Sequence, residues 1–298
     1  MPNTLTNVKD IKIAQSALQP WMAGLLPLRA LSTNFSPEPA DKLDTVRVPV
    51  IGAPSASNDF AGTYLQGIDS AISTLPVVLN RHKFQTFHVT AKEASESAVP
   101  VLETLLQSKA TQLAQDVLLD IFSLITADHY GAPVIPALAP TAFDYKKVLG
   151  VREACGNAKM PAAQRSIILD AGYYTNLLAD DVVAKSFNLN VSAPGVVEAQ
   201  VKRLAGFDLY VTIVLPPDHP EKLIGFAVHP SAIAVAMRYL QPVAEYDEAG
   251  AVTDPETGLT FGYLRYTETS SNRIFITIEC LYGFAVAIPA GLKRLVKP

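Results

Sequence analysis

The sequence predicts an elongated α+β protein, on the strength of two patterns in the order of its residues. Between positions 97 and 125 the apolar residues recur every three or four positions, which predicts one long amphipathic helix. On both sides of this helix the apolar residues alternate as they do in β-strands. Since about 26 helical residues make a rod of roughly 40 Å, we expect the helix to be too long for a compact domain.

The composition indicates a surface that other subunits cover. The 298 residues are 49% hydrophobic and only 17% charged, whereas about 25% of the residues in a typical globular chain are charged. Lysine and arginine number 24 and the acidic residues 28, which gives a net charge of 24 − 28 = −4. Without a basic cluster the chain lacks the surface that tight nucleic-acid binding needs, so contact with DNA should be weak and nonspecific.

Several classes of protein find no support in the sequence. No apolar run reaches the roughly 18 residues that cross a membrane, and no signal peptide pattern opens the chain, so we expect a protein made and used in the cytoplasm. Cys155 and Cys280 fit no CxxC spacing and are expected to be reduced core residues. Nucleotide-binding glycine loops, the zinc-protease motif and the serine nucleophile elbow are absent from the sequence.

Residues 1–45 have the pattern of an arm. A weak helical pattern over residues 8–30 is broken by Pro20 and Pro27, and residues 36–39, Ser-Pro-Glu-Pro, predict an extended linker. The segment has too little apolar surface to fold alone. We expect it to lie along its own body or along a neighbouring copy.

Residues 46–90 predict a projecting β-hairpin or long loop. One strand covers residues 45–52, and a second runs through residues 75–80 and on through residues 84–90. About two dozen small and polar residues lie between the strands. Loops of this length seldom lack a function, so we expect this one to contact a partner.

The remainder of the chain predicts a small α/β unit and a closing strand pair. Thr141 to Asp144 form a capping-box pattern for a helix that ends near Ala154. A strand at 166–170, a helix at 173–179, strands at 209–215 and 224–228, and a helix at 231–240 follow. Residues 260–269 and 274–282 then form an antiparallel pair around a turn at 270–272.

Candidate groups for catalysis or metal binding are few. The five histidines show no metal-ligand spacing. Asp128–His129 and Asp218–His219 could orient an imidazole, yet neither has a nucleophile in its sequence context, and turns attract such residues. A further acidic group lacks EF-hand spacing and fits a solvated hairpin tip: Asp247, Glu248, Asp254 and Glu256. We therefore expect no catalytic residue, no cofactor and no metal.

The order of these parts resembles the major capsid protein of tailed bacteriophages, which has the Hong Kong 97-like fold. The resemblance covers nearly the whole chain after the first 20 residues and depends on order and spacing more than on any strict motif. The stretches that carry it are residues 25–35, 46–50, 84–90 running into the long helix, 225–234, Gly283 and 289–292.

The resemblance implies a division of the chain into parts. These are an N-terminal arm (1–45), an extended E-loop hairpin with its flanking strands (46–90), a P domain with a long spine helix (91–135), an α/β A domain (136–255), returning P-domain strands (256–283) and a C-terminal segment that rejoins the A domain (284–298). It also implies a weak subunit interface on the E-loop, at Asn58, Asp59, Phe60, Tyr64 and Leu65.

The resemblance also implies a function and partners. Identical subunits would assemble, in the host cytoplasm, into the pentamers and hexamers of an icosahedral virion shell around double-stranded DNA. A portal, a scaffolding protein encoded separately and, in some shells, a decoration protein would be partners. The family prototype links its subunits through an E-loop lysine. Here no lysine lies between Val48 and His82, so we expect a noncovalent shell.

Other functions stay open on the sequence alone. An encapsulin-like nanocompartment shell resembles the same architecture but holds cargo enzymes, and a co-purifying enzyme in a sealed shell would identify it. A cytoplasmic α/β enzyme could work at residues 216–221 or 128–131, and it would form a small oligomer with one deep pocket. A tail or portal component is a further alternative.

Overall fold

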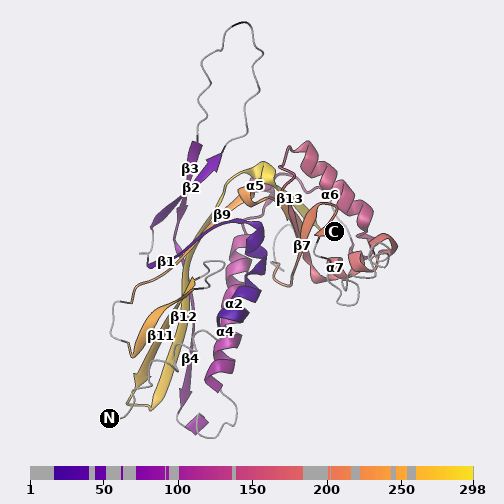
Figure 1. The fold of residues 1–298 in the computed structure, drawn as a ribbon. Helices are drawn as coiled ribbons and strands as arrows, with labels where there is room; N and C mark the ends of the chain where they lie inside the picture. The colour runs from indigo at the N-terminus through magenta and orange to yellow at the C-terminus, as the bar shows by residue number, and fades with distance from the viewer. Residues whose placement is uncertain are drawn as a thin grey trace.

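The computed structural model describes most of the chain. It covers residues 17–39, 44–51, 62, 72–90, 92–93, 101–135, 139–183, 201, 203–215, 222–242, 246–253 and 260–297. The described elements form an elongated body (Figure 1), in which a long helix lies along a twisted sheet and a smaller α/β unit lies to one side. The mixed class that the sequence predicts is confirmed.

The predicted long helix is α4 (Val101–Phe122). It ends three residues before the predicted boundary at Ile125, and residues 97–100 lie outside the described part. Its buried side chains recur at helical spacing and pack into the main core: Leu106, Ala110, Leu113, Ala114, Val117, Leu118, Ile121 and Phe122. A short helix, α2 (Leu18–Gly24), packs against α4, where a Cβ added at Gly24 would come within 2.6 Å of the Ala114 Cβ. The missing side chain thus lets the two helices approach closely.

The described part of the first 45 residues lies on its own body. Trp21 is fully buried, and its ring meets the ring of Phe261 edge-on at 5.8 Å. The 3-10 turn η1 (Leu26–Ala30) follows, and then strand β1 (Ser32–Pro39), which pairs in parallel with β9. Residues 36–39 therefore belong to a strand, and the predicted linker at this point is wrong. The backbone pairing with β9 supplies hydrogen bonds that a linker would lack.

The main sheet has six strands in the order β1-β9-β12-β11-β10, with β4 also paired to β12. Its members besides β1 are β4 (Arg81–Thr90), β9 (Ile233–Tyr239), β10 (Glu248–Thr253), β11 (Thr260–Glu268) and β12 (Arg273–Val286). The predicted closing pair is confirmed by the antiparallel pairing of β11 with β12, with Glu268 opposite Arg273. One face of β4 and β12 packs against α4.

Strand β9 corrects the predicted helix at 231–240. Residues 230–232 form the 3-10 turn η3 (Pro230–Ala232), and β9 begins at Ile233. Every side chain from Ile233 to Met237 is buried, because β9 lies between β1 and β12 in the sheet. A strand that is buried on both faces shows no alternation in its sequence, and an apolar run of that kind is easily mistaken for a buried helix.

A second strand prediction is also wrong. The predicted continuous strand over residues 75–90 is in fact two strands, β3 (Ile72–Val78) and β4, which belong to different sheets. Strand β3 pairs antiparallel with β2 (Thr45–Ile51), with Thr45 opposite Val78 and Ile51 opposite Ile72. This pairing confirms the base of the predicted hairpin. Figure 1 shows β2 and β3 at one end of the body and the tips of β4, β11 and β12 at the other.

The smaller unit holds a five-stranded sheet in the order β13-β8-β5-β7-β6. These strands are β13 (Leu292–Val296), β8 (Leu223–Val228), β5 (Ser166–Asp170), β7 (Phe207–Thr212) and β6 (Arg203–Leu204). One face, with Ile168 and Phe226, joins the core around α4. The other face, with Ile167 and Leu169, joins a second core. The alternation of side chains along β5 thus holds the unit to the rest of the molecule.

Helices α6 (Tyr145–Asn157) and α7 (Ala171–Leu178) flank this sheet. The predicted helix at 173–179 is confirmed with a start two residues earlier. The predicted capping box is wrong in its register, because the N-cap of α6 is Asp144, whose Oδ1 accepts a hydrogen bond from the Lys147 backbone N–H at 2.9 Å. Thr141 instead lies in the 3-10 turn η2 (Pro140–Ala142). Two further short elements complete the described fold, α5 (Ala127–Tyr130) and η4 (Pro289–Gly291).

Candidate functional site at the hairpin seat

The predicted interface residues Asn58, Asp59, Phe60, Tyr64 and Leu65 lie outside the described residues. The structure does describe the two strands that lead to them, β2 and β3, and the place where these strands meet the body. We call this meeting place the hairpin seat and define it by Val78 and Leu79 of the hairpin side and Gly283 of β12. It lies at the base of the strand pair that leads to the predicted interface.

Apolar packing holds the hairpin stem on the outer face of the main sheet, the face turned away from α4. Val77 and Leu79 are fully buried, and they share a small core with Ala234 and Ala236 of β9 and Leu281 of β12. Partly buried residues of both hairpin strands surround this core. The seat therefore rests on few large side chains, with alanines of β9 beneath it.

At the centre of the seat, backbone meets backbone. A Cβ built on Gly283 would lie 2.1 Å from the Val78 carbonyl oxygen and 3.3 Å from the Leu79 Cα. Real Cβ atoms essentially never come within 3.0 Å of another heavy atom. Gly283 is thus required here, as is usual for a strand glycine approached closely by another backbone. The seat also fixes the main chain through the Leu79 N–H, which donates to the Asp44 carbonyl oxygen at 2.8 Å.

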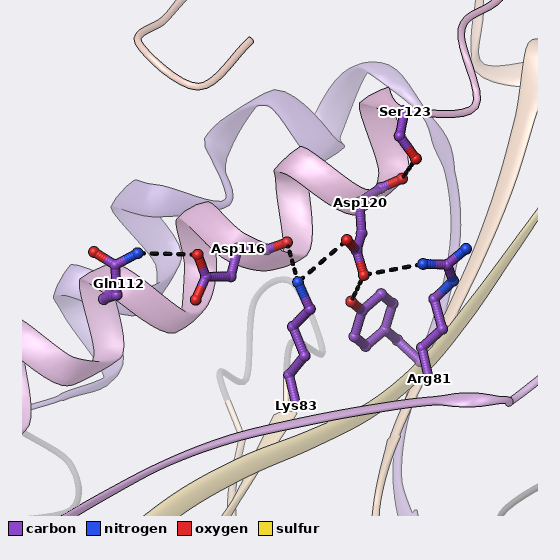
Figure 2. A network of polar contacts seen from close by, with 7 residues as sticks. Arg81, Lys83, Gln112, Asp116, Asp120 and Ser123 are labelled. Atoms are coloured by element: carbon purple, nitrogen blue, oxygen red, sulfur yellow. Dashed lines mark hydrogen bonds and ion pairs between the residues drawn. The ribbon is translucent and has the colours of Figure 1, made fainter. Parts of the chain in front are cut away.

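A polar cluster lies immediately beside the seat, on the opposite face of the same strands. We call it the Asp120 cluster and define it by Arg81, Lys83, Asp120 and Tyr282, drawn in Figure 2. Arg81 Nη1 donates to Asp120 Oδ2 at 3.1 Å, Lys83 Nζ is 3.2 Å from Asp120 Oδ1, and the Tyr282 hydroxyl donates to Asp120 Oδ2 at 2.5 Å. Two strands are thereby tied to one carboxylate of α4.

Further contacts strengthen this cluster. Lys83 Nζ also donates to the Asp116 carbonyl oxygen at 2.9 Å, one turn earlier on α4. The guanidinium carbon of Arg81 lies 4.6 Å from the centre of the Phe284 ring, within the range of a cation–π contact. Ser123 donates to the Asp120 backbone carbonyl at 2.6 Å near the end of the helix. The cluster therefore joins the last turns of α4 to β4 and β12.

The electrostatics of the cluster favour an ionised Asp120. Burial alone would raise the pKa of this carboxyl, but hydrogen bonds from Tyr282 and Lys83, with the charges of Lys83 and Arg81, outweigh burial and hold the pKa below its usual 3.8. Burial, followed by the hydrogen bond to Asp120, raises the pKa of the Tyr282 phenol. Tyr282 therefore stays protonated and serves as a donor, and Asp120 stays a carboxylate and accepts.

Beyond the hairpin stem, side chains on the outer face of the main sheet are more exposed than those beneath the stem. Phe84 of β4 is 60% exposed. Beside it, His82 Nε2 lies 2.9 Å from Glu279 Oε2, and Thr86 and Thr277 are hydrogen-bonded through their hydroxyls at 2.8 Å. Farther along the strands, the rings of Tyr266 and Phe275 stack at 4.9 Å. Apolar and aromatic groups thus alternate here with polar pairs that satisfy each other.

The sequence contains alternatives to a structural site, and the described residues give them little support. His129 Nδ1 lies 2.8 Å from the Leu124 carbonyl oxygen and 3.1 Å from Thr126 Oγ1, contacts that fit a capped turn. Asp218, His219 and residues 216–221 lie outside the described part, as do Asp254 and Glu256, while Gly250 lies within strand β10 and not at a hairpin tip. Within the described ranges no group of three metal-ligating side chains occurs, and no helix is long and apolar enough to cross a membrane.

Sequence reasoning found the hairpin but missed the Asp120 cluster. Asp120 occupies a position that, in the sequence, looks like the solvent face of a helix, and its partners come from strands roughly 40 and 160 residues away. Gly283 could have been found, since an isolated glycine inside a strand pattern often marks a close backbone approach. No such local signal marks Asp120.

Comparisons with known proteins agree with this architecture. No family model matches the chain, and no curated protein matches its sequence. Among solved structures, the capsid of cyanophage P-SCSP1u matches with a TM-score of 0.57 at 13% identity, over 90% of this chain and 86% of that one. A structure from Mycobacterium phage Che8 matches with a TM-score of 0.52 at 17% identity, over 85% and 84% of the two chains. A virus-like particle from Pyrococcus furiosus matches with a TM-score of 0.52 at 12% identity, over 95% and 97%.

Proposed function

From the Hong Kong 97-like fold of this chain, we propose that it is the major capsid protein of a tailed bacteriophage, which assembles into the pentamers and hexamers of an icosahedral shell around double-stranded DNA. One observation carries the proposal. A long helix backs a sheet, a hairpin leaves one end of it and an α/β unit lies at the side, and the chain with this arrangement matches the capsid structure of cyanophage P-SCSP1u over 90% of this chain and 86% of that one. The protein's role is then structural and not catalytic.

The surface of the chain supports assembly with identical copies. The chain exposes 16905 Å², whereas a compact monomer of 32.0 kDa would expose about 12,000 Å². Obligate interfaces commonly cover about 2,000 to 5,000 Å² or more. A surface in excess, on a chain with few charges, fits a subunit whose neighbours cover much of it.

An open sheet edge supports the same proposal. Within the described part, β6 pairs with β7 only at Phe207 and Asp208, so the outer edge of β7 beyond that point carries no partner strand. Val211 is 42% exposed and Ile213, just past the end of β7, is 75% exposed. Monomeric proteins usually protect such edges with charges or proline, yet residues 209–213 contain neither.

The parts of the chain receive the following roles in the proposal. Residues 46–90, with the interface residues Asn58, Asp59, Phe60, Tyr64 and Leu65, form the E-loop that contacts a neighbouring subunit. Residues 91–135 and 256–283 make the P domain, residues 136–255 the A domain around the symmetry axes, residues 1–45 the arm, and residues 284–298 the segment that rejoins the A domain. The proposed arm lies on the body of its own subunit, and the contacts of α2 with α4 and of β1 with β9 support this for residues 17–39.

Partners and location follow from the same role. A portal and a separate scaffolding protein would assist assembly in the host cytoplasm, and some shells would add a decoration protein. The finished subunit would reside in the virion. Because the net charge is −4 and no basic cluster stands out in the sequence, the packaged DNA would be held weakly, without the counterion release that tight binding requires.

An encapsulin-like shell is the second and less favoured candidate, and one match bears on it. The virus-like particle from Pyrococcus furiosus covers more of both chains than the phage structures do, at a similar TM-score. This shell would close around a cargo enzyme, whereas a phage shell needs a portal vertex and holds a genome. The two candidates therefore differ in content and not in fold.

Negative-stain microscopy of the purified protein tests both candidates. We expect regular polyhedral particles, formed by the chain alone or with a separately encoded scaffolding protein. Particles that package DNA when the portal genes are added support the phage role, and particles that co-purify with a single enzyme support the nanocompartment. A monodisperse monomer at high concentration, with and without the neighbouring genes, would overturn both.

A further inference from the structure

We propose that the hairpin seat and the Asp120 cluster together fix the angle at which the β2–β3 hairpin leaves the body, and that this angle sets the curvature at which neighbouring copies meet. The inference rests on the proposed function, because it concerns how copies of this chain join. It concerns residues that lie outside the predicted contact surface and act on that surface by positioning it.

The connection between hairpin and body is a tight turn, in which the Asn80 N–H donates to the Val78 carbonyl oxygen at 3.0 Å. Only Leu79 and Asn80 separate β3 from β4, and β2 and β3 form a two-stranded sheet of their own. A two-stranded hairpin is at best marginally stable without other support. Its direction must therefore come from the surface on which it rests.

The seat supplies a hard stop on one side. The Val78 carbonyl lies where a Cβ of any residue other than glycine would stand at position 283, and Leu79 is buried beside it. Backbone atoms cannot yield as the end of a long side chain can. The hairpin therefore sits as close to β12 as main-chain packing permits, and the distance is set by the absence of a side chain.

The Asp120 cluster holds the other side. Tyr282 and Gly283 are consecutive on β12, so their positions face opposite sides of the sheet. The side chain of Tyr282 reaches α4 through Asp120, while Gly283 receives the hairpin. Arg81, three residues after Val78, binds the same carboxylate at 3.1 Å. One short stretch of β12 therefore lies between the helix and the hairpin. Figure 2 shows the polar contacts on the helix side.

This arrangement couples the helix to the hairpin. A displacement of the end of α4 relative to β12 would move Tyr282 and Arg81 through Asp120, and it would reach Val78 within three residues of chain. The stem has seven residues in each strand. Val46, Val48 and Leu75 pack its near half on the sheet, so the part of β3 beyond Leu75 is a lever of about 10 Å at roughly 3.3 Å per residue. A small tilt at the seat becomes a larger displacement at the end that meets the neighbour.

Gly283→Ala is the direct test, and Gly250→Ala is its matched control. A Cβ at position 283 must move at least 0.9 Å (3.0 − 2.1) away from the Val78 oxygen, whereas nothing lies within 4 Å of a Cβ at Gly250 in β10. We expect Gly283→Ala particles to show a shifted or broadened diameter distribution in cryo-electron microscopy. We also expect hydrogen exchange in β2 and β3 of the unassembled subunit to rise roughly tenfold, with α4 unchanged. Gly250→Ala should match the wild type in both.

The outcomes separate the two levels of the proposal. Uniform Gly283→Ala shells of wild-type diameter would overturn the inference and leave the proposed function intact. Failure of the wild type to form shells would instead count against the proposed function. If Gly283→Ala does not fold, Arg81→Met decides. Methionine keeps the aliphatic bulk of the arginine side chain and removes its hydrogen bond to Asp120. Shells of wild-type diameter from Arg81→Met would also overturn the inference.

Discussion

At the scale of single residues, Asp120 is the acceptor that two strands share. Three side chains converge on one carboxylate that is 24% exposed. A half-buried charge without partners would destabilise the fold, and a fully hydrogen-bonded one can hold elements in register. Asp120 can hold the elements together because both of its carboxylate oxygens have protein partners, where water would otherwise have to reach them.

We expect Asp120→Ala to lower the free energy of unfolding by about 1.5 to 3 kcal/mol, the range for hydrogen bonds to charged groups. The substitution leaves Arg81, Lys83 and the Tyr282 hydroxyl without their shared acceptor. Asp116→Ala is the control, because the Asp116 carboxylate accepts a hydrogen bond from the exposed Gln112 on the same helix, and the bond from Lys83 to the Asp116 backbone carbonyl survives the substitution. Urea unfolding of unassembled subunits measures both, and equal losses in the two variants would contradict the role of the cluster.

The same residue predicts a dependence of stability on pH. The folded state holds the pKa of Asp120 below 3.8, so the ionised carboxylate stabilises the fold at every pH above that unfolded-state value. This contribution is lost as the pH falls through the lower, folded pKa. We expect the acid limb of a stability curve between about pH 5 and pH 2 to flatten in Asp120→Asn relative to wild type. Parallel acid limbs in the two proteins would show that Asp120 is not linked to folding in this way.

At the scale of elements, local patterns predicted the parts whose partners are near in sequence. The long helix and the closing pair β11–β12 follow from periodicity and from a turn, and both were found. The sequence of β9 predicts a helix because its strand partners are distant: Ser32 lies opposite Ala234, across about 200 residues. Burial on both faces removes the alternation of apolar and polar residues that identifies a strand. Only the pairing with distant strands then decides between a helix and a strand.

The start of α6 offers a sharp test at this scale. The N-cap is Asp144, which accepts a hydrogen bond from the Lys147 N–H at 2.9 Å, and not Thr141 as the sequence pattern indicates. Asp144→Ala should therefore lower the free energy of unfolding by about 1 kcal/mol. Thr141→Ala should stay within about 0.5 kcal/mol of wild type. A larger loss of stability in Thr141→Ala than in Asp144→Ala, measured by chemical denaturation, would support Thr141 as the N-cap that the sequence pattern predicts.

At the scale of the whole molecule, the fold and the composition point to one arrangement. The chain has few charges, its described residues leave part of one edge of β7 without a partner strand, and its hairpin rests on a glycine, three features that fit the proposed role as one subunit among identical copies. Of the predicted contact residues, the sequence indicates only that they lie between two strands in a segment rich in small and polar residues. Their contact with a neighbour stays a prediction, because a segment that orders on binding has partners outside its own chain.

The chemistry of the hairpin predicts that these copies are held together without covalent links. An isopeptide bond needs a lysine amine that attacks a side-chain carbonyl and releases ammonia or water, and no lysine lies between Val48 and His82. The next lysine, Lys83, is engaged by Asp120 at 3.2 Å and by the Asp116 carbonyl at 2.9 Å on the inner side of the sheet. Purified shells boiled in detergent should therefore give one band at the 32.0 kDa of the subunit. A ladder of multiples that persists after reduction would show that some other amine forms the bond, and mass spectrometry of the linked peptides would identify it.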